Sequence, residues 1–162
     1  MKFHFTASNS KEARKAKKDF ESSYSQSEPE SADVIVPIGG DGILLKSLHD
    51  FNNLNKPFFG INYGSVGFLM NSANKNNLED TINNSKSTEL RPLKMIAKDD
   101  NDNSYESIAY NEVSLMRQSH QASKFEIKIN EVKRMNELIC DGVLVSTSAG
   151  STAYNLSAHG SI

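Results

Sequence analysis

The feature that most constrains the fold is an apolar run that ends directly in a glycine-rich turn. Residues 32–38 are almost all apolar, which is typical of a strand buried on both faces of a parallel sheet. Gly-Gly-Asp-Gly follows at 39–42, and apolar residues at helical spacing continue over 43–51. A second apolar segment, 56–61, then restarts a strand. Strand, turn, helix and strand in this order predict a βαβ unit.

The segment before this unit predicts one more strand and one more helix. Residues 2–7 have the pattern of a short strand, and Asn9 with Glu12 forms a capping box for a helix through about Phe20. Pro37 lacks the N–H that a ladder hydrogen bond needs, so it argues against a fully central position for its strand. The first half of the chain, residues 1–90, is therefore expected to be an α/β domain.

Beyond about residue 91 the apolar period changes from helical to two-fold. Alternation at 93–98 and 125–130 predicts strands, and the polar cluster at 99–103 predicts a hairpin turn. The apolar run at 137–140 is expected to continue through Asp141 and Gly142 as the same strand. Residues 91–162 are therefore expected to form a β-rich domain. Because no element follows that would cover it, we expect a fragment with an incomplete second domain.

Composition narrows the class of protein. The 18 Lys and Arg are scattered and the net charge is −2, which argues against a nucleic-acid partner. Cys140 is the single cysteine, which excludes an intrachain disulfide and fits a reducing compartment. The sequence has neither an apolar run that spans a bilayer nor the core of a secretion signal. We therefore expect a cytoplasmic protein without a membrane partner.

The glycine turn at 39–42 lies where α/β folds bind ligands, between a buried strand and a helix. Backbone N–H groups and the helix dipole attract phosphate there, so a di- or triphosphate can be held without a lysine. The carboxylate of Asp41 would be repelled by that phosphate unless it binds a metal ion or the attacking hydroxyl. The alternative is a tight turn in which Asp41 only caps the helix.

The segment 60–69 repeats the arrangement of a strand followed by a glycine loop. Its glycines, Gly60, Gly64 and Gly67, do not match the G-x-G-x-x-G fingerprint, and the chain has no P-loop motif. This loop can form a second wall of the crevice at the glycine turn. A loop that merely needs positive φ angles is the alternative.

Two later segments place polar side chains at strand ends. Asn111 and Glu112 interrupt the apolar stretch 108–116, and because strand neighbours point to opposite faces they cannot both face one core. A ligand at the strand end explains them, whereas a solvent-facing Glu beside a hydrogen-bonded Asn is the alternative. The segment 141–155 is rich in small hydroxyl residues and contains Tyr154, which suits a ribose and a purine. Its alternative is a plain polar loop.

Taken in their order along the chain, the segments described above resemble the NAD kinase family over about residues 32–161. Gly-Gly-Asp-Gly alone is shared with phosphofructokinases and with diacylglycerol and sphingosine lipid kinases. The Asn-Glu pair at 111–112 and Gly-Ser-Thr-Ala-Tyr at 150–154 look like NAD kinase only, and the block at 60–69 is similar to the family's as well. The resemblance implies a Rossmann-like α/β N-terminal domain of the NAD kinase and diacylglycerol kinase type. An all-β C-terminal domain, incomplete here, would follow it, with the substrate site between the two.

The resemblance also implies the chemistry: the γ-phosphoryl of ATP passes to the 2′-hydroxyl of the adenosine ribose of NAD, giving NADP and ADP, with Mg or Mn as divalent cofactor. Asp41 would be the catalytic residue, and the backbone of Gly39, Gly40 and Gly42 would cradle the ATP phosphates. The residues implied to bind NAD are Asp41, Gly42, Asn111, Glu112, Asp141, Ala149, Thr152, Ala153, Tyr154 and Ser157. No side chain is assigned as a metal ligand. Homo-oligomers, dimers or tetramers, are implied, with sites that borrow residues from a neighbouring subunit.

Two other functions stay open at the level of sequence. A lipid kinase would share only the Gly-Gly-Asp-Gly turn, and a non-catalytic fragment would bind NAD or ATP without transfer. The residues also do not choose between ATP and polyphosphate as donor, or between NAD and NADH as acceptor.

Overall fold

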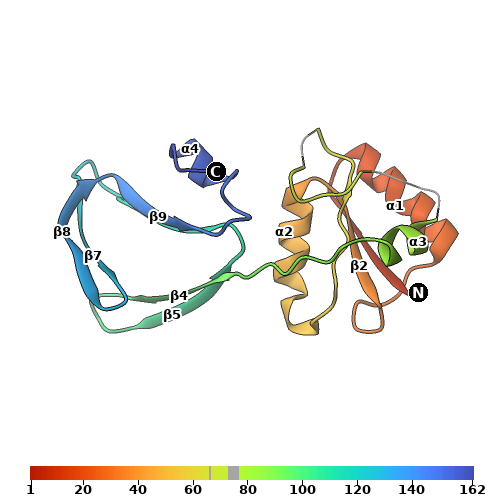
Figure 1. The fold of residues 1–162 in the computed structure, drawn as a ribbon, viewed down its shortest axis with the longest axis horizontal. Coiled ribbons are helices and arrows are strands. Elements are labelled where there is room, and N and C mark those ends of the chain that lie inside the picture. The colour runs from red at the N-terminus through yellow and green to blue at the C-terminus, as the bar shows by residue number, and fades with distance from the viewer. Residues whose placement is uncertain (66, 73–76) are drawn as a thin grey trace. The chain divides into compact units, whose positions relative to one another are not determined.

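The computed structural model describes residues 1–65, 67–72 and 77–162, and the chain divides into two compact units, Met1–Thr88 and Glu89–Ile162 (Figure 1). The first is an α/β unit and the second is built mainly of β-strands, which confirms the predicted fold class. None of the helices in the described ranges is both long and apolar enough to cross a membrane.

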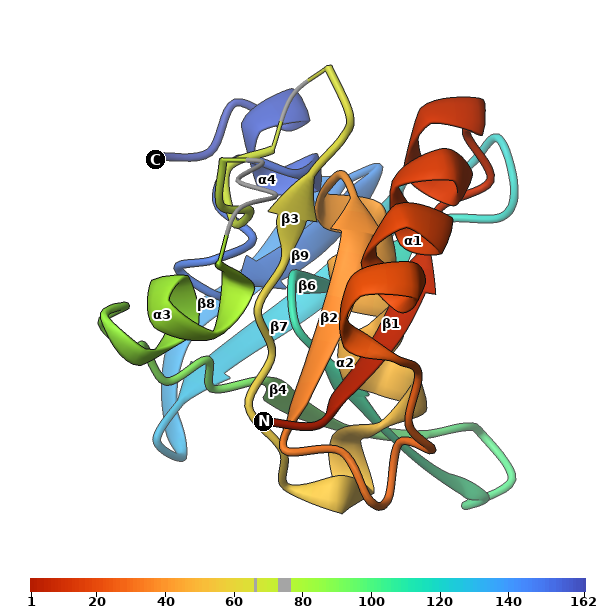
Figure 2. The same cartoon turned by 90° about the vertical axis from the view of Figure 1, so that its right-hand side faces the viewer.

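A parallel three-stranded sheet, in the order β1-β2-β3, organises the first unit. The strands are β1 (Phe3–Ala7), β2 (Val34–Gly39) and β3 (Ile61–Asn62). Helices α1 (Lys11–Tyr24) and α2 (Asp41–Asp50) lie on opposite faces of the sheet, as Figures 1 and 2 show together. A 3₁₀ turn, η1 (Asn52–Leu54), and a short helix, α3 (Leu78–Asn83), complete the unit. The order β2, α2, β3 with parallel pairing confirms the predicted βαβ unit.

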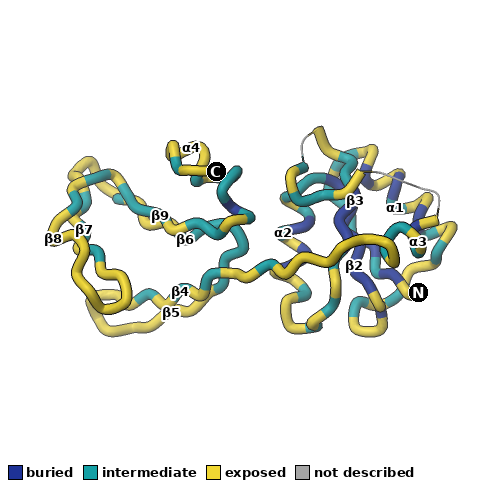
Figure 3. Tube along the Cα trace, viewed as in Figure 1, coloured by how far each residue is buried: buried dark blue, intermediate teal, exposed yellow. Residues whose placement is uncertain are grey.

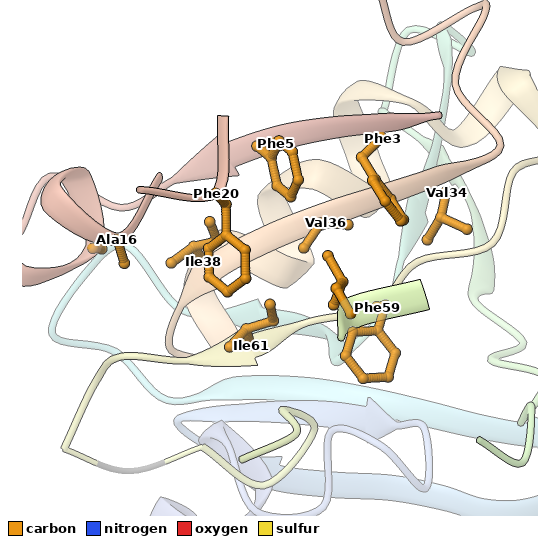
Figure 4. Packing of buried hydrophobic residues seen from close by; sticks show 11 residues of the cluster. Phe3, Phe5, Ala16, Phe20, Val34, Val36, Ile38, Phe59 and Ile61 are labelled. Carbon is orange, nitrogen blue, oxygen red and sulfur yellow. The ribbon is translucent and has the colours of Figure 1, made fainter. Parts of the chain in front are cut away.

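Aromatic and aliphatic residues from the sheet and from α1 form most of the core of this unit (Figure 4). Phe3, Phe5 and Phe20 are at most 2% exposed, and the rings of Phe5 and Phe20 stack with centroids 5.7 Å apart. Truncating one such ring to alanine typically costs about 3–5 kcal/mol. These rings pack beside β2, so the turn that follows β2 is attached to a well-packed part of the sheet.

The expectation from Pro37 is wrong, because β2 is the central strand. Ile35 donates its N–H to the Pro57 carbonyl at 3.0 Å and accepts from the Phe59 N–H at 2.9 Å, so odd-numbered residues of β2 face β3. Pro37 lies on that same side and cannot donate there. All six residues of β2 are buried. Burial on both faces outweighs one missing ladder bond, whose net contribution is only about 1 kcal/mol.

The first helix begins and ends later than expected. Ser10 is its N-cap, and the Ser10 hydroxyl accepts from the Ala13 N–H at 3.1 Å. Asn9, predicted as the cap, instead accepts from the Arg14 guanidinium at 2.9 Å. The helix continues to Tyr24 because the Tyr24 ring still packs against Phe3, edge to face at 5.6 Å. Asn9 and Ser10 are both good capping residues, so the sequence alone did not decide between them.

Three antiparallel ladders build the second unit. They pair β4 (Leu93–Lys98) with β5 (Ser104–Ala109), β6 (Glu112–Met116) with β9 (Gly142–Ser146), and β7 (Ser123–Ile129) with β8 (Val132–Cys140). The chain then reaches α4 (Tyr154–Ser157). The predicted hairpin turn joins β4 and β5. Hydrogen bonds from the side chain and backbone of Asn103 lower the pKa of Asp99 in that turn.

The expected continuous strand from 137 to 145 is wrong. The chain leaves the β7–β8 ladder at Cys140 and enters the β6–β9 ladder at Gly142. A Cβ at Gly142 would fall against the Leu115 carbonyl oxygen, so this crossing brings two backbones into close approach. Apolar pattern alone does not reveal that a strand changes its partner.

The two units differ sharply in burial (Figure 3). The hydrophobic residues of the described core all lie in the first unit. Within 89–162, every residue of which is described, Gly150 is the only buried residue. Leu115, Ile139 and Val145 are 55%, 59% and 63% exposed. The ladders of the second unit therefore leave much apolar surface uncovered.

Candidate functional site

The glycine turn lies at the carboxyl end of β2, where α2 begins. Gly39 has φ +150°, and a Cβ there would lie 2.8 Å from the Ser8 hydroxyl oxygen and 3.0 Å from Cγ2 of Ile43. Only glycine fits that position without strain. Gly40 is the N-cap of α2 and supplies no side-chain cap hydrogen bond. The first N–H groups of α2 are therefore placed to meet an anion.

Gly42 lies in a different environment from Gly39. A Cβ at this residue would meet no described atom within 4 Å, and its φ is not in the positive region. Neither packing nor backbone conformation therefore demands glycine at this position. A requirement for glycine would have to come from a molecule that approaches the backbone.

Asp41 does not cap α2, which was the alternative left open by the sequence, because the N-cap is Gly40. Its carboxylate instead joins the two glycine loops. Oδ2 accepts from the Phe68 N–H at 2.9 Å, and Oδ1 accepts from the Leu69 N–H at 3.0 Å. The sequence did not predict these two partners.

The loop after β3 lies directly against the glycine turn. Tyr63 donates its N–H to the Gly39 carbonyl at 2.8 Å. A Cβ at Gly64 would lie 3.3 Å from Cα of Gly40, so the absence of a side chain allows the close approach. Segments 39–42 and 60–69, which we suggested as two walls of one crevice, are thus neighbours, except that Val66 lies outside the described residues.

In the second unit, Asn111 and Glu112 lie where β5 passes to β6 and not inside one strand. The Asn111 carbonyl accepts from the Thr147 N–H at 2.8 Å and from the Ser146 hydroxyl at 3.3 Å. Glu112 pairs with Ser146 across the ladder. Its Oε2 is buried and accepts no hydrogen bond from any described residue. A buried carboxylate oxygen normally has a donor, so a ligand hydroxyl suits it.

The segment after β9 is hydrogen-bonded to the connection between β5 and β6. The Thr147 hydroxyl donates to the Tyr110 carbonyl at 2.6 Å and accepts from the Gly150 N–H at 2.9 Å. A Cβ at Gly150 would lie only 2.5 Å from Cα of Asn111. Burial raises the pKa of the Tyr110 phenol. Thr147 was not among the predicted site residues, although it stands at the start of the hydroxyl-rich segment that was.

The remaining predicted residues follow along this segment. Ala149, Thr152 and Ala153 are half-buried, and Ser157 is exposed on α4. The Tyr154 hydroxyl donates to the sulfur of Met116 at 3.2 Å. Segment 147–150 therefore lies against Asn111, whereas Tyr154 lies toward the far end of β6.

Asp141 is not brought to Glu112 within its unit. Glu112 pairs with Ser146 at one end of the β6–β9 ladder, and Met116 pairs with Gly142 at the other. Four residues of strand separate these ends by about 14 Å. Asp141 lies beyond the second end, where its Oδ1 accepts from Nε of Arg117 at 2.5 Å, and its side chain is 74% exposed.

Comparison with known proteins gives consistent matches over the chain. A family model of the ATP-NAD kinase N-terminal domain matches residues 1–90, and one of the C-terminal domain matches residues 110–162. An NAD kinase of Brucella melitensis is 49% identical over 162 residues, which are 100% of this chain and 63% of that protein. An NAD kinase of Rickettsia canadensis is 52% identical over 139 residues, 86% of this chain and 54% of that protein.

A solved structure shares the fold. Yeast NADH kinase complexed with NADH superposes with a TM-score of 0.79 at 23% identity, covering 100% of this chain and 62% of the yeast chain. The chain thus spans less than two thirds of the length of the relatives named above.

Proposed function

Because the chain belongs to the NAD kinase family, we propose that the protein transfers the γ-phosphoryl of ATP to the 2′-hydroxyl of the adenosine ribose of NAD, giving NADP and ADP. The observation that carries the proposal is the turn at 39–42. This turn presents uncapped helix N–H groups, one glycine that the fold itself does not require, and a fixed carboxylate.

The backbone of Gly39, Gly40 and Gly42 cradles the phosphates of ATP in this proposal. Helix N-termini attract phosphate through free N–H groups and the helix dipole. The open space at Gly42 supports this role, since a phosphate can approach the backbone there without displacing protein atoms.

Asp41 orients the acceptor hydroxyl and receives its proton late in the transfer. In a loose transition state the attacking oxygen gains little charge, so positioning contributes more than proton removal. Each carboxylate oxygen can accept two hydrogen bonds. The bonds from Phe68 and Leu69 occupy one position on each oxygen, which leaves the others for ribose hydroxyls.

A divalent ion, Mg²⁺ or Mn²⁺, enters this proposal with the nucleotide. Among the described residues no group of three His, Cys, Asp or Glu side chains could hold a metal ion. Mg²⁺ is commonly bound by one or two carboxylates together with substrate phosphates. In this proposal the ion arrives on ATP and neutralises the charge of the phosphates, and no side chain of the protein is assigned as its ligand.

The acceptor NAD binds residues of the second unit in this proposal. Oε2 of Glu112 has the chemistry to accept from a ribose hydroxyl, and Asn111 stands beside it. The other residues proposed to contact NAD are Ala149, Thr152, Ala153, Tyr154, Ser157 and Asp141. The separation of Asp141 from Glu112 along the ladder is compatible with a homo-oligomer in which Asp141 serves a neighbouring subunit.

A homo-oligomer, a dimer or tetramer, is included in the proposal because of the separation of Asp141 from Glu112 along the ladder. A cytoplasmic location belongs to the same proposal, supported by the free thiol of the single Cys140.

The activity is tested by incubating the 162-residue chain with NAD, Mg²⁺ and ATP and measuring NADP. Parallel reactions contain polyphosphate in place of ATP, NADH in place of NAD, or Mn²⁺ in place of Mg²⁺. We expect NADP from at least one donor and acceptor pair. Binding of NAD and ATP without product would favour the non-catalytic fragment, and phosphorylation of a diacylglycerol or sphingosine instead of NAD would favour the lipid kinase.

Replacing Gly42 should separate ligand binding from stability. We expect Gly42→Ala to leave the fold intact and to stabilise it by up to about 1 kcal/mol, because alanine is the better helix former and has room there. The KM for ATP should rise roughly tenfold or more, since hydrogen bonds to charged phosphate are lost. Thermal unfolding and steady-state kinetics measure the two effects.

Gly39→Ala is the comparison for stability alone, since Gly39 also belongs to the proposed cradle. At φ +150° and 2.8 Å from the Ser8 hydroxyl oxygen, its Cβ should destabilise the protein. An unchanged KM for ATP in Gly42→Ala would contradict the phosphate cradle.

A further inference from the structure

Both oxygens of the half-buried Asp41 carboxylate are hydrogen-bonded by backbone N–H groups. The donors are consecutive residues, Phe68 and Leu69, at 2.9 and 3.0 Å. One N–H to each oxygen fixes the plane of the carboxylate as well as its place. Two bonds to a charged acceptor are each stronger than neutral ones.

The loop that provides these donors is anchored at both of its ends. Asn62 donates its N–H to the Asn71 carbonyl at 2.8 Å, and Asn71 donates its N–H to the Gly60 carbonyl at 2.8 Å. The Gly64 N–H, inside the loop, donates to Oδ1 of Asn62 at 2.9 Å. Phe68 and Leu69 therefore project their N–H groups from a braced loop.

We propose that the backbone N–H groups of Phe68 and Leu69 are the positioning groups for Asp41, and that they orient its carboxylate toward the acceptor hydroxyl. This inference rests on the proposed function for its catalytic consequence, whereas the positioning itself is a property of the protein without substrate. Asp41 in turn holds the loop, so the carboxylate and the loop order each other.

Gly67 permits this arrangement. A Cβ at Gly67 would lie 3.1 Å from Cγ and 3.2 Å from Cβ of Met70, closer than ordinary contact. The backbone immediately before Phe68 would then have to move away from Met70. Gly67→Ala should therefore displace the Phe68 N–H. Truncating Met70 to alanine removes its Cγ but leaves its Cβ at 3.2 Å and Cγ of Asn62 at 3.3 Å, so it should relieve only part of the displacement.

The positioning is tested first without substrate, by amide hydrogen exchange at Phe68 and Leu69 followed by NMR. In Asp41→Asn one carboxylate oxygen becomes an NH₂ group, which cannot accept from a backbone N–H. We expect exchange at one or both amides to accelerate about tenfold or more, the scale of a lost charge-assisted bond. Asp50→Asn, an exposed acid on the same helix that pairs with Lys46, should leave both rates unchanged.

The catalytic consequence is tested by kinetics of Gly67→Ala, Met70→Ala and the double variant. We expect Gly67→Ala to lower kcat about tenfold or more with little change in the KM for ATP, as for other small misplacements of a catalytic group. The double variant should recover only part of kcat, because Cβ of Met70 and Cγ of Asn62 still lie close to the new Cβ. Met70→Ala alone should be close to the parent protein. A general loss of folding would not be restored by a second truncation.

The outcomes separate this inference from the proposed function. Unchanged exchange in Asp41→Asn, or normal kcat in Gly67→Ala, would overturn the positioning role even if the protein makes NADP. Accelerated exchange in a protein that makes no NADP would support the coupling of Asp41 to the loop and refute the proposed function alone.

Discussion

Asp41→Asn is expected to lower the turnover rate of NADP formation roughly 100-fold or more, the usual scale for loss of a general base. The affinity for NAD should change far less, because the amide keeps the size and one acceptor of the carboxylate. Two effects act together: the variant cannot receive the proton of the 2′-hydroxyl, and it gives up one of the two bonds from Phe68 and Leu69. Steady-state kcat and NAD titration by calorimetry, in a form of the protein that makes NADP, measure both quantities.

Asp50→Asn is the matched control, since Asp50 carries the same side chain at the other end of α2. Its partner is Lys46, so we expect near-parental kcat. Near-normal turnover in Asp41→Asn would rule out the assigned role. Equal losses of turnover in the two variants would point to a general effect of removing negative charge from α2.

Gly150→Ala is expected to reduce kcat/KM for NAD roughly 100-fold, because small displacements of substrate-positioning groups can have effects of that size. Gly150 is buried, and a Cβ there would lie 2.5 Å from Cα and 2.6 Å from the carbonyl carbon of Asn111. The backbone of Asn111 cannot move aside for the new Cβ as a flexible side chain could. The segment that carries Thr152, Ala153 and Tyr154 must therefore move away from Asn111 and Glu112.

Ser148→Ala tests whether the effect is specific to that contact. Ser148 is exposed and lies two residues away in the same segment, so its truncation should change kcat/KM little. Exchange protection of β2 should be unaffected in both variants, because Gly150 belongs to the other unit. Parental kinetics in Gly150→Ala would show that the segment tolerates the displacement and does not form the NAD site.

The fold class was predictable because apolar period changes with secondary structure. The buried run before Gly39 and the two-fold alternation after residue 91 indicated an α/β unit followed by strands. The expectation drawn from Pro37 was wrong, because a proline removes only one ladder hydrogen bond, whereas burial on both faces decides the position of β2. The division at Asp141 was missed because β8 and β9 have the same local pattern on either side of the change of partner.

The candidate site was predictable as a set of segments but not as contacts. Glycine spacing identified the turn at 39–42 and the loop at 60–69 separately. The bonds from Phe68 and Leu69 to Asp41 span 27 and 28 residues, and no local signal encodes such a pairing. The burial of Oε2 of Glu112, which has no hydrogen-bond partner among the described residues, depends in the same way on how β6 packs in the folded chain.

The scaffold that bears Glu112 and Gly150 consists of two-stranded ladders with little buried surface of their own. Isolated two-stranded ladders are only marginally stable in water. A ligand that binds only the ordered form shifts such an equilibrium by mass action. If the chain binds NAD as proposed, part of the intrinsic binding free energy is used to order this unit, and the measured dissociation constant then contains a folding contribution. Changes that tighten the ladders, even far from any bound group, would then act as affinity mutations.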